Sequence, residues 1–137
     1  MDITSKKALI DYVVNLEIKS TSSIIKRSIV NYGSIRNMTV YRGQSEEQTT
    51  INPNYWFSTT TSFDIAKNEF GRNVFMIHLN DIMALEVNEY VFEDIGPKSE
   101  EEEIIVQGEG MFYSNRTLSE KGFSKIKDNL YETWYVV

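Results

Sequence analysis

A pair of glutamates stands at the start of an apolar segment, in the stretch KSEEEEIIVQG (residues 98–108). In an extended chain, residues two apart share a face, so Glu101 and Glu103 are expected to point the same way at the mouth of a strand. A fixed carboxylate at such a place stabilises the positive charge that develops on a sugar ring when its C–N or C–O bond breaks. The alternative is a solvated acidic loop, which is what we expect of Glu100 and Glu102.

An arginine followed by a glycine ends a second strand-like segment, MTVYRG (residues 38–43). The guanidinium of Arg42 can donate two hydrogen bonds to one phosphate group. Gly43 has no Cβ and lets a flat ring approach the backbone closely. The alternative for Arg42 is a surface ion pair.

Short hydroxyl side chains follow an aromatic segment in YWFSTTTS (residues 55–62). Ser58 can orient a neighbouring carboxylate, and Thr59 and Thr60 can brace the strand. The alternative is an ordinary β-branched strand in which Ser62 caps the helix that follows.

Two amphipathic helices are expected before these motifs. Over residues 4–18 the apolar side chains recur every three or four positions, and Thr4 or Ser5 is the expected cap. A second helix is expected over residues 21–31, before Gly33. The residues expected to face inward are Ala8, Leu9, Tyr12, Val13 and Leu16 in the first helix and Ile24, Ile25, Ile29 and Val30 in the second.

The rest of the chain is typical of strands joined by short connections. Besides the segments above, strands are expected over residues 73–79, 103–107 and 130–137, with a short helix over 62–70. Residues 85–94 are ambiguous between a strand and a turn, and residues 93–103 indicate a mobile surface loop. The short spacing between strands favours sheets that pack on each other over a strand–helix–strand repeat. We therefore expect one α+β domain over residues 1–137, with N-terminal helices and a mainly antiparallel β-sandwich core.

The composition excludes several kinds of site and partner. The net charge of about −6 on 137 residues disfavours nucleic acid and anionic membranes as partners. Without cysteine there is no disulfide, thiolate nucleophile or zinc finger, and the only histidine, His78, is expected to be packed or hydrogen-bonded rather than catalytic. No signal-peptide pattern and no apolar run of about 20 residues is present. We expect a cytoplasmic monomer, in the producing cell or a host cell, that needs no metal.

In this order, the three motifs resemble those of the ADP-ribosyltransferases of the arginine–serine–glutamate class, which includes bacterial toxins and vertebrate ecto-enzymes. The aromatic–Arg–Gly motif of that family is similar to residues 41–43, its Ser-Thr-Ser motif to residues 58–60, and its Glu-x-Glu motif to residues 101–103. The resemblance covers roughly residues 38–110. The chain departs from the family in having Thr60 as the third residue of the serine motif and a shorter helical region. It also lacks the aromatic residue that many relatives carry before Glu-x-Glu to contact the target; Phe92 is the nearest.

The resemblance implies that NAD is the substrate and that a target protein of a host or target cell accepts its ADP-ribose. It gives Glu103 the role of stabilising the charged ribose as nicotinamide leaves, and Ser58 that of holding Glu103. It gives Glu101 the role of positioning the acceptor, for which a glutamate indicates an arginine side chain. The other residues that it implicates in NAD binding are Arg42 on the diphosphate or the adjacent ribose phosphate, Gly43 on the nicotinamide amide, Thr59 in the serine motif, Arg72 as a second phosphate contact, and Phe70 or Phe63 as a ring that stacks on nicotinamide.

Two other functions stay open at this stage. An NAD glycohydrolase would use water in place of the acceptor, and the missing aromatic residue favours it slightly. A catalytically inactive domain would bind a partner through its acidic loop, although the joint presence of Arg42, Ser58 and Glu103 argues against this. A toxin, a viral or phage effector and a housekeeping enzyme all fit the sequence, and the small size of the chain indicates that it is made inside its target cell or delivered there by other machinery.

Overall fold

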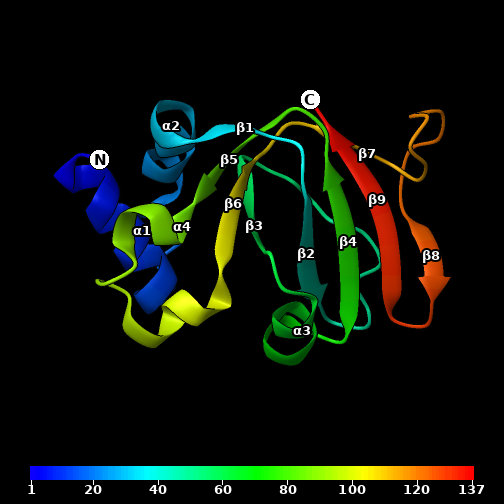
Figure 1. Cartoon of the computed structure of the whole chain (residues 1–137), viewed down its shortest axis with the longest axis horizontal. Coiled ribbons are helices and arrows are strands. Elements are labelled where there is room, and N and C mark those ends of the chain that lie inside the picture. Colours follow the sequence, from blue (N-terminus) through cyan, green and yellow to red (C-terminus); the bar gives the residue numbers. More distant parts are fainter.

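The computed structural model describes all 137 residues and begins with two neighbouring helices, α1 (Ile3–Asn15) and α2 (Ser22–Tyr32) (Figure 1). Both helices were predicted, but the cap of α1 was not. Asp2 precedes the helix and its Oδ1 accepts a hydrogen bond from the backbone N–H of Ser5 at 3.3 Å, in place of a cap by Thr4 or Ser5. The helix also ends early, because Leu16 adopts a left-handed backbone conformation (φ 55°) and leaves its side chain 72% exposed.

Each helix buries one stripe of apolar side chains. In α1, Leu9 and Val13 are buried as predicted, and in α2 the i, i+4 pair Ile25 and Ile29 is buried. Val30 was predicted to face inward but is 68% exposed. It lies one position after Ile29, which turns it about 100° around the helix and away from the contact.

Nine strands are hydrogen-bonded in the order β1-β5-β6-β3-β2-β4-β9-β7, and β8 also pairs with β9. All pairs are antiparallel except β4 with β9. The strands are β1 (Ser34–Arg36), β2 (Thr39–Gln44), β3 (Trp56–Thr60), β4 (Asn73–Leu79), β5 (Ile82–Glu86), β6 (Glu103–Gln107), β7 (Met111–Tyr113), β8 (Ser124–Lys127) and β9 (Leu130–Val136).

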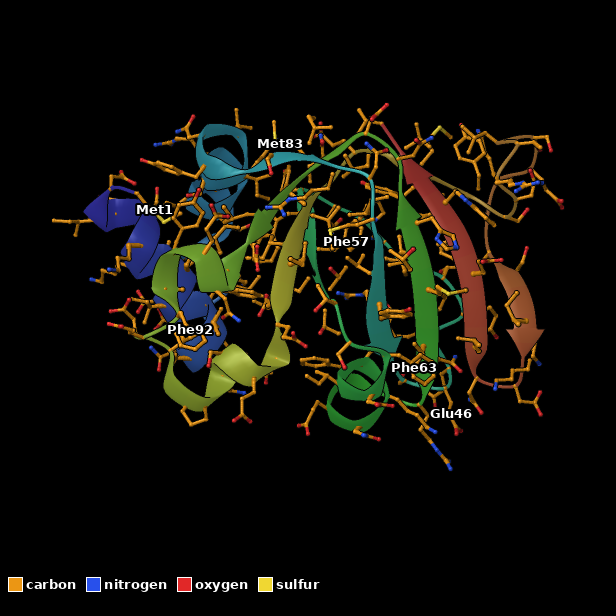
Figure 2. The ribbon with its side chains drawn as sticks, in the orientation of Figure 1. Met1, Glu46, Phe57, Phe63, Met83 and Phe92 are labelled. Atoms are coloured by element: carbon orange, nitrogen blue, oxygen red, sulfur yellow. The ribbon has the colours of Figure 1, made fainter.

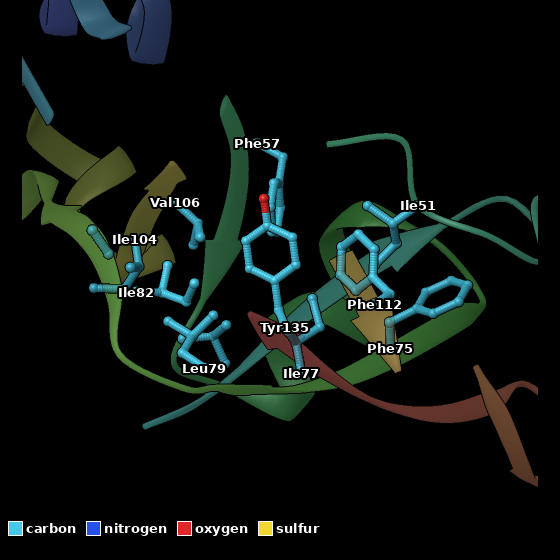
Figure 3. Packing of buried hydrophobic residues seen from close by; sticks show 12 residues of the cluster. Ile51, Phe57, Phe75, Ile77, Leu79, Ile82, Ile104, Val106, Phe112 and Tyr135 are labelled. Carbon is cyan, nitrogen blue, oxygen red and sulfur yellow. The ribbon is translucent and has the colours of Figure 1, made fainter. Parts of the chain in front are cut away.

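The two halves of this sheet meet at a single residue pair, Tyr41 on β2 with Thr60 on β3. From there the halves diverge, and their inner faces pack against each other. Phe57 of the first half contacts Tyr135 of the second, with ring centroids 5.1 Å apart (Figure 3). The same cluster includes Ile104 and Ile77 from opposite halves. The predicted mainly antiparallel sandwich core is thus confirmed.

Helices α1, α2 and α4 (Val87–Val91) form a helical layer, which covers the outer face of only the first half of the sheet, β1-β5-β6-β3. Leu85 on β5 and Ile105 on β6 pack against Leu9 and Ile25 in a second apolar cluster. Residues 85–94, which the sequence left ambiguous, end β5 and then form the short helix α4, which joins this layer. Strands β1, β7 and β8 were not predicted, since each has only three or four residues.

Two short helical segments lie near the end of the sheet where β2, β3 and β6 meet. After β3 the chain forms α3 (Phe63–Ile65) and a π-helical turn, η1 (Ala66–Phe70), and Ser62 caps α3 as predicted, with its Oγ 3.2 Å from the backbone N of Ile65. Before β6 it forms a 3₁₀ helix, η2 (Gly96–Glu101). Figure 2 shows Phe63 on α3 and Phe92 on the side of the molecule that carries the helical layer.

Residues 93–103, expected to be a surface loop, include the 3₁₀ helix η2, which polar contacts hold to the rest of the chain. The side-chain amide of Asn88 donates to the carbonyl oxygen of Ser99 at 2.8 Å, and Thr60 Oγ1 donates to the carbonyl oxygen of Glu101 at 2.7 Å. His78 on β4 is hydrogen-bonded as expected, to Thr39 Oγ1 and Glu132 Oε2, each at 2.8 Å. No helix combines the length and the apolar character needed to cross a bilayer.

Candidate active site

A pocket of about 280 Å³ opens beside the single residue pair that joins the two half-sheets. It draws its walls from β2, β3, β6, α1, η1 and η2, so segments far apart in the sequence meet there. The residues that line it are Tyr12, Val13, Leu16, Tyr41, Arg42, Gly43, Ser58, Thr59, Phe70, Lys98, Glu101 and Glu103.

Glu103 is the first residue of β6 and points its carboxylate into the pocket. Oε2 accepts a hydrogen bond from Ser58 Oγ at 2.7 Å, as the resemblance implied, while Oε1 has no protein partner. The pKa of Glu103 is raised to about 7, mainly by burial; the nearby Glu101 acts in the same direction, and the Ser58 hydrogen bond, Lys98 and Arg42 act against it. A carboxyl group with such a pKa is neutral for half the time near neutral pH and titrates where enzymes work.

Ser58 is itself held by a second hydroxyl that the sequence analysis did not identify. Tyr12 Oη on α1 lies 2.5 Å from Ser58 Oγ. The Tyr12 ring packs edge-on against Trp56, with centroids 4.8 Å apart. Tyr12 was predicted only as part of the apolar stripe of α1. The sequence feature that could have indicated this contact is a hydroxyl group on an otherwise apolar helix face, because buried tyrosine hydroxyls find hydrogen-bond partners.

Arg42 lies on β2 and is held by two hydrogen bonds. Its Nη1 donates to the carbonyl oxygen of Ser58 at 2.7 Å, and its Nε donates to Gln44 Oε1 at 2.8 Å. Gln44 is in turn held by the carbonyl oxygen of Thr50 at 2.8 Å. Nη2 of Arg42 has no protein partner. Burial lowers the pKa of Arg42, and the alternative of a surface ion pair does not describe it.

Glu101 reaches the same pocket as Glu103, but not for the reason expected. The chain between them is not extended: Glu101 ends η2, and Glu102 adopts a left-handed conformation (φ 48°) with its side chain exposed. The carboxylate of Glu101 is 18% exposed and lies 3.2 Å from Lys98 Nζ, which also lines the pocket. The pair of carboxylates therefore depends on a helix end and one unusual backbone angle rather than on strand alternation.

Gly43 lines the pocket, but its lack of a side chain has a packing reason. A Cβ at this position would lie 2.1 Å from the carbonyl oxygen of Ala66, so only glycine lets η1 lie directly against β2. Thr59 is buried and its Oγ1 donates to the carbonyl oxygen of Ile104 at 2.9 Å, which braces β3 against β6.

The remaining candidates divide between the pocket and its surroundings. Phe70 lines the pocket with its side chain 46% exposed. Phe63 does not line it and packs edge-on against Tyr41, with centroids 5.8 Å apart. Arg72 also lies outside the pocket: its side chain is 81% exposed and pairs with Glu46 at 2.7 Å. No cluster of three or more His, Cys, Asp or Glu side chains suited to a metal ion is present.

Comparison with solved structures identifies the fold. The eukaryotic mono-ADP-ribosyltransferase ART2.2 superposes with a TM-score of 0.67 at 13% identity, over 98% of this chain and 66% of that one. A mutant of ART2.2 in complex with NAD gives a TM-score of 0.64 at 14% identity, over 99% of this chain and 66% of that one. Plx2a, an ADP-ribosyltransferase toxin from Paenibacillus larvae, gives a TM-score of 0.64 at 12% identity, over 100% of this chain and 88% of that one.

No family model and no curated protein matches this sequence. The likeness is one of three-dimensional structure, and it extends over nearly the whole chain, which spans just under two thirds of the length of ART2.2. The resemblance that the three motifs carry is confirmed at the level of the fold. The chain has the toxin-like fold of the mono-ADP-ribosyltransferases.

Proposed function

We propose that this chain is an NAD-dependent ADP-ribosyltransferase, which moves ADP-ribose from NAD to a protein side chain and releases nicotinamide. One observation carries the proposal. The carboxylate of Glu103 is held by Ser58 in a pocket that also presents the guanidinium of Arg42, within the fold shared with these enzymes.

The residues of the pocket suit the nicotinamide half of the substrate. Arg42 offers Nη2, its one terminal nitrogen without a protein partner, as a donor to a phosphate oxygen. Tyr41 and Phe70 supply aromatic surface at the pocket wall for a flat ring. The pocket volume of about 280 Å³ is too small for a whole dinucleotide, so we expect the adenosine half to lie outside it.

Glu103 would act on the ribose. Its Oε1 has no protein partner and is left to accept a hydrogen bond from a ribose hydroxyl, while Ser58 fixes Oε2. As the bond to nicotinamide breaks, positive charge develops on the ribose ring, and an ionised Glu103 stabilises it. Removing one preorganised electrostatic contact of this kind from an active site costs about 3–4 kcal/mol, or two to three orders of magnitude in rate.

Glu101 is our candidate for positioning the acceptor. It lies on the wall of the same pocket, at the end of η2. A carboxylate binds a guanidinium through two parallel hydrogen bonds, which supports an arginine side chain as the acceptor. In the free protein this carboxylate is paired with Lys98.

An NAD glycohydrolase is the second candidate. The observation that favours it is the absence of an aromatic side chain on η2, which contributes Lys98 and Glu101 to the pocket wall. The nearest aromatic residue before η2 in the sequence is Phe92, which is 57% exposed and follows α4. With no firm contact to a target protein, water would attack the ribose carbon instead.

The test is incubation with labelled NAD in a cell lysate, with nicotinamide release measured in parallel. The variants are Glu103→Gln, which removes the charge but keeps the shape, and Glu100→Gln as the matched control on the exposed side of η2. We expect labelled protein and nicotinamide release with the wild type and with Glu100→Gln. Both should fall at least about 100-fold with Glu103→Gln.

The outcomes separate the candidates. Labelled protein that depends on Glu103 supports the transferase, and mass spectrometry of the labelled band then gives the target and the acceptor residue. Glu103-dependent release of nicotinamide with no labelled protein, in lysates from several cell types, supports the glycohydrolase. If NAD neither binds in calorimetry nor is cleaved, the chain is an inactive domain that uses this fold for another purpose.

A further inference from the structure

The hydrogen bonds around Ser58 have only one arrangement when Glu103 is ionised. A serine hydroxyl carries a single proton, and an ionised carboxylate can only accept. The Ser58 proton must therefore lie on the bond to Glu103 Oε2, at 2.7 Å. Tyr12 is then the donor in its own hydrogen bond with Ser58 Oγ, at 2.5 Å.

We propose that Tyr12 is a positioning residue of the active site: its hydroxyl donates to Ser58 Oγ and thereby keeps the Ser58 proton directed at Glu103. The inference rests on the proposed function in taking Glu103 as the group that acts on the substrate. Helix α1, which lies in the helical layer and not in the sheet, thus supplies one of the groups that control the protonation of the Glu103 carboxylate.

The surroundings of Tyr12 suit a permanent donor. Its ring is held by Trp56, whose Nε1 donates to the carbonyl oxygen of Ser22 on α2 at 3.0 Å. Burial, together with the charge of Glu103, raises the pKa of Tyr12 to about 12. The hydroxyl therefore keeps its proton over the whole range in which Glu103 titrates, and Ser58 is its only hydrogen-bond partner.

Donation by Tyr12 polarises the Ser58 hydroxyl and makes it a stronger donor to the carboxylate. A hydrogen bond to the charged form of an acid lowers its pKa, so Tyr12 favours the ionised form of Glu103. The other charged groups that face Glu103 are Glu101, which opposes ionisation, and Lys98 and Arg42, which favour it. None of these three is hydrogen-bonded to Tyr12 or to the Ser58 hydroxyl.

The test is the titration of Glu103 followed by carbon-detected NMR of its carboxyl group, in protein without substrate. Tyr12→Phe removes the hydroxyl and keeps the ring against Trp56. The matched control is Tyr90→Phe, which also deletes one tyrosine hydroxyl from the helical layer, in this case a donor to the carbonyl oxygen of Tyr32 at 2.7 Å. We expect Tyr12→Phe to raise the pKa of Glu103 by roughly half a unit and Tyr90→Phe to leave it unchanged.

A second variant keeps the hydroxyl in place and is expected to shift the pKa of Glu103 in the opposite direction. Tyr12→3-fluorotyrosine makes the phenol a stronger hydrogen-bond donor, so it should lower the pKa of Glu103. It also serves if Tyr12→Phe does not fold. Equal Glu103 titrations in the wild type and in the folded Tyr12 variants would overturn the proposal and leave Tyr12 a packing residue.

The kinetic arm uses nicotinamide release. Tyr12→Phe should lower kcat several-fold, with little change in KM for NAD, and should move the acidic limb of the pH–rate profile to higher pH. Because the NMR titration needs no substrate, it decides the role of Tyr12 even if the chain cleaves no NAD. Failure of the proposed function and failure of this inference are therefore distinguishable.

Discussion

Replacing Glu103 with glutamine should stabilise the fold, and the gain should depend on pH. Burial raises the pKa of Glu103 from 4.5 to about 7. Between these values the folded chain binds this proton more tightly than the unfolded chain, so raising the pH through the interval destabilises the wild type. The difference of about 2.5 between the two values, at about 1.36 kcal/mol for each unit, corresponds to ~3 kcal/mol of stability lost by pH 8.

The glutamine variant does not titrate, and its side-chain oxygen can still accept the hydrogen bond from Ser58. We therefore expect Glu103→Gln to be about 2–3 kcal/mol more stable than the wild type at pH 8. At pH 5, where folded Glu103 is almost fully protonated, the gain should be under about 1 kcal/mol. The assay is urea unfolding at both pH values, with the free energy of unfolding extrapolated to water.

Glu100→Gln is the control for this experiment, because Glu100 is exposed. It should change the free energy of unfolding by less than about 0.5 kcal/mol at either pH. A gain for Glu103→Gln that is equal at pH 5 and pH 8, or a loss at both, would refute the reasoning. Such a result would mean that ionisation of Glu103 does not destabilise the folded state.

Three further predictions concern the groups around Glu103. If the ionised carboxylate is the active form, kcat/KM for nicotinamide release should rise with pH to half of its plateau at about pH 7, and a rate that falls over this interval would contradict this. Arg42→Lys cannot make both hydrogen bonds of the planar guanidinium, so it should weaken NAD binding by about tenfold or more in calorimetry and lower the free energy of unfolding by ~1–2 kcal/mol. Gly43→Ala places a methyl group 2.1 Å from the backbone oxygen of Ala66, so it should cost ~2 kcal/mol or more in urea unfolding, and an unchanged midpoint would show that η1 yields.

The sequence predicted the parts of the site that are contiguous in the chain. The segments around Arg42, Ser58 and Glu103 each combine a strand pattern with a reactive side chain. The residue types and the order of these segments could therefore be recognised without a structure. Strand pairing then brings two of them together directly, because Ser58 and Glu103 lie on the adjacent strands β3 and β6.

What the sequence did not predict depends on contacts between distant segments. The pattern of α1 showed that Tyr12 faces inward, but only the packing of Tyr12 against β3 in the folded chain shows that its hydroxyl reaches Ser58. Arg72 follows η1 closely in the chain, yet Gly71 (φ 153°) intervenes and the arginine pairs with Glu46 outside the pocket. Nearness in sequence to a site residue does not give the direction of a side chain across a turn.

The four consecutive glutamates show what a local sequence pattern predicts and what it leaves to the fold. By composition they are a single acidic run, but the fold gives them different environments. Glu100 and Glu102 are exposed, Glu101 lines the pocket while paired with Lys98 at a helix end, and Glu103 lines the pocket while bonded to Ser58. These environments differ because Glu102, in a left-handed conformation, stands between the end of η2 and the start of β6 and changes the direction of the chain. An acidic segment beside an apolar strand is therefore not a contradiction: Glu100 and Glu102 stay in water, whereas Glu103 is partly buried in the pocket, and this burial raises its pKa into the range in which a carboxyl group can act on a substrate.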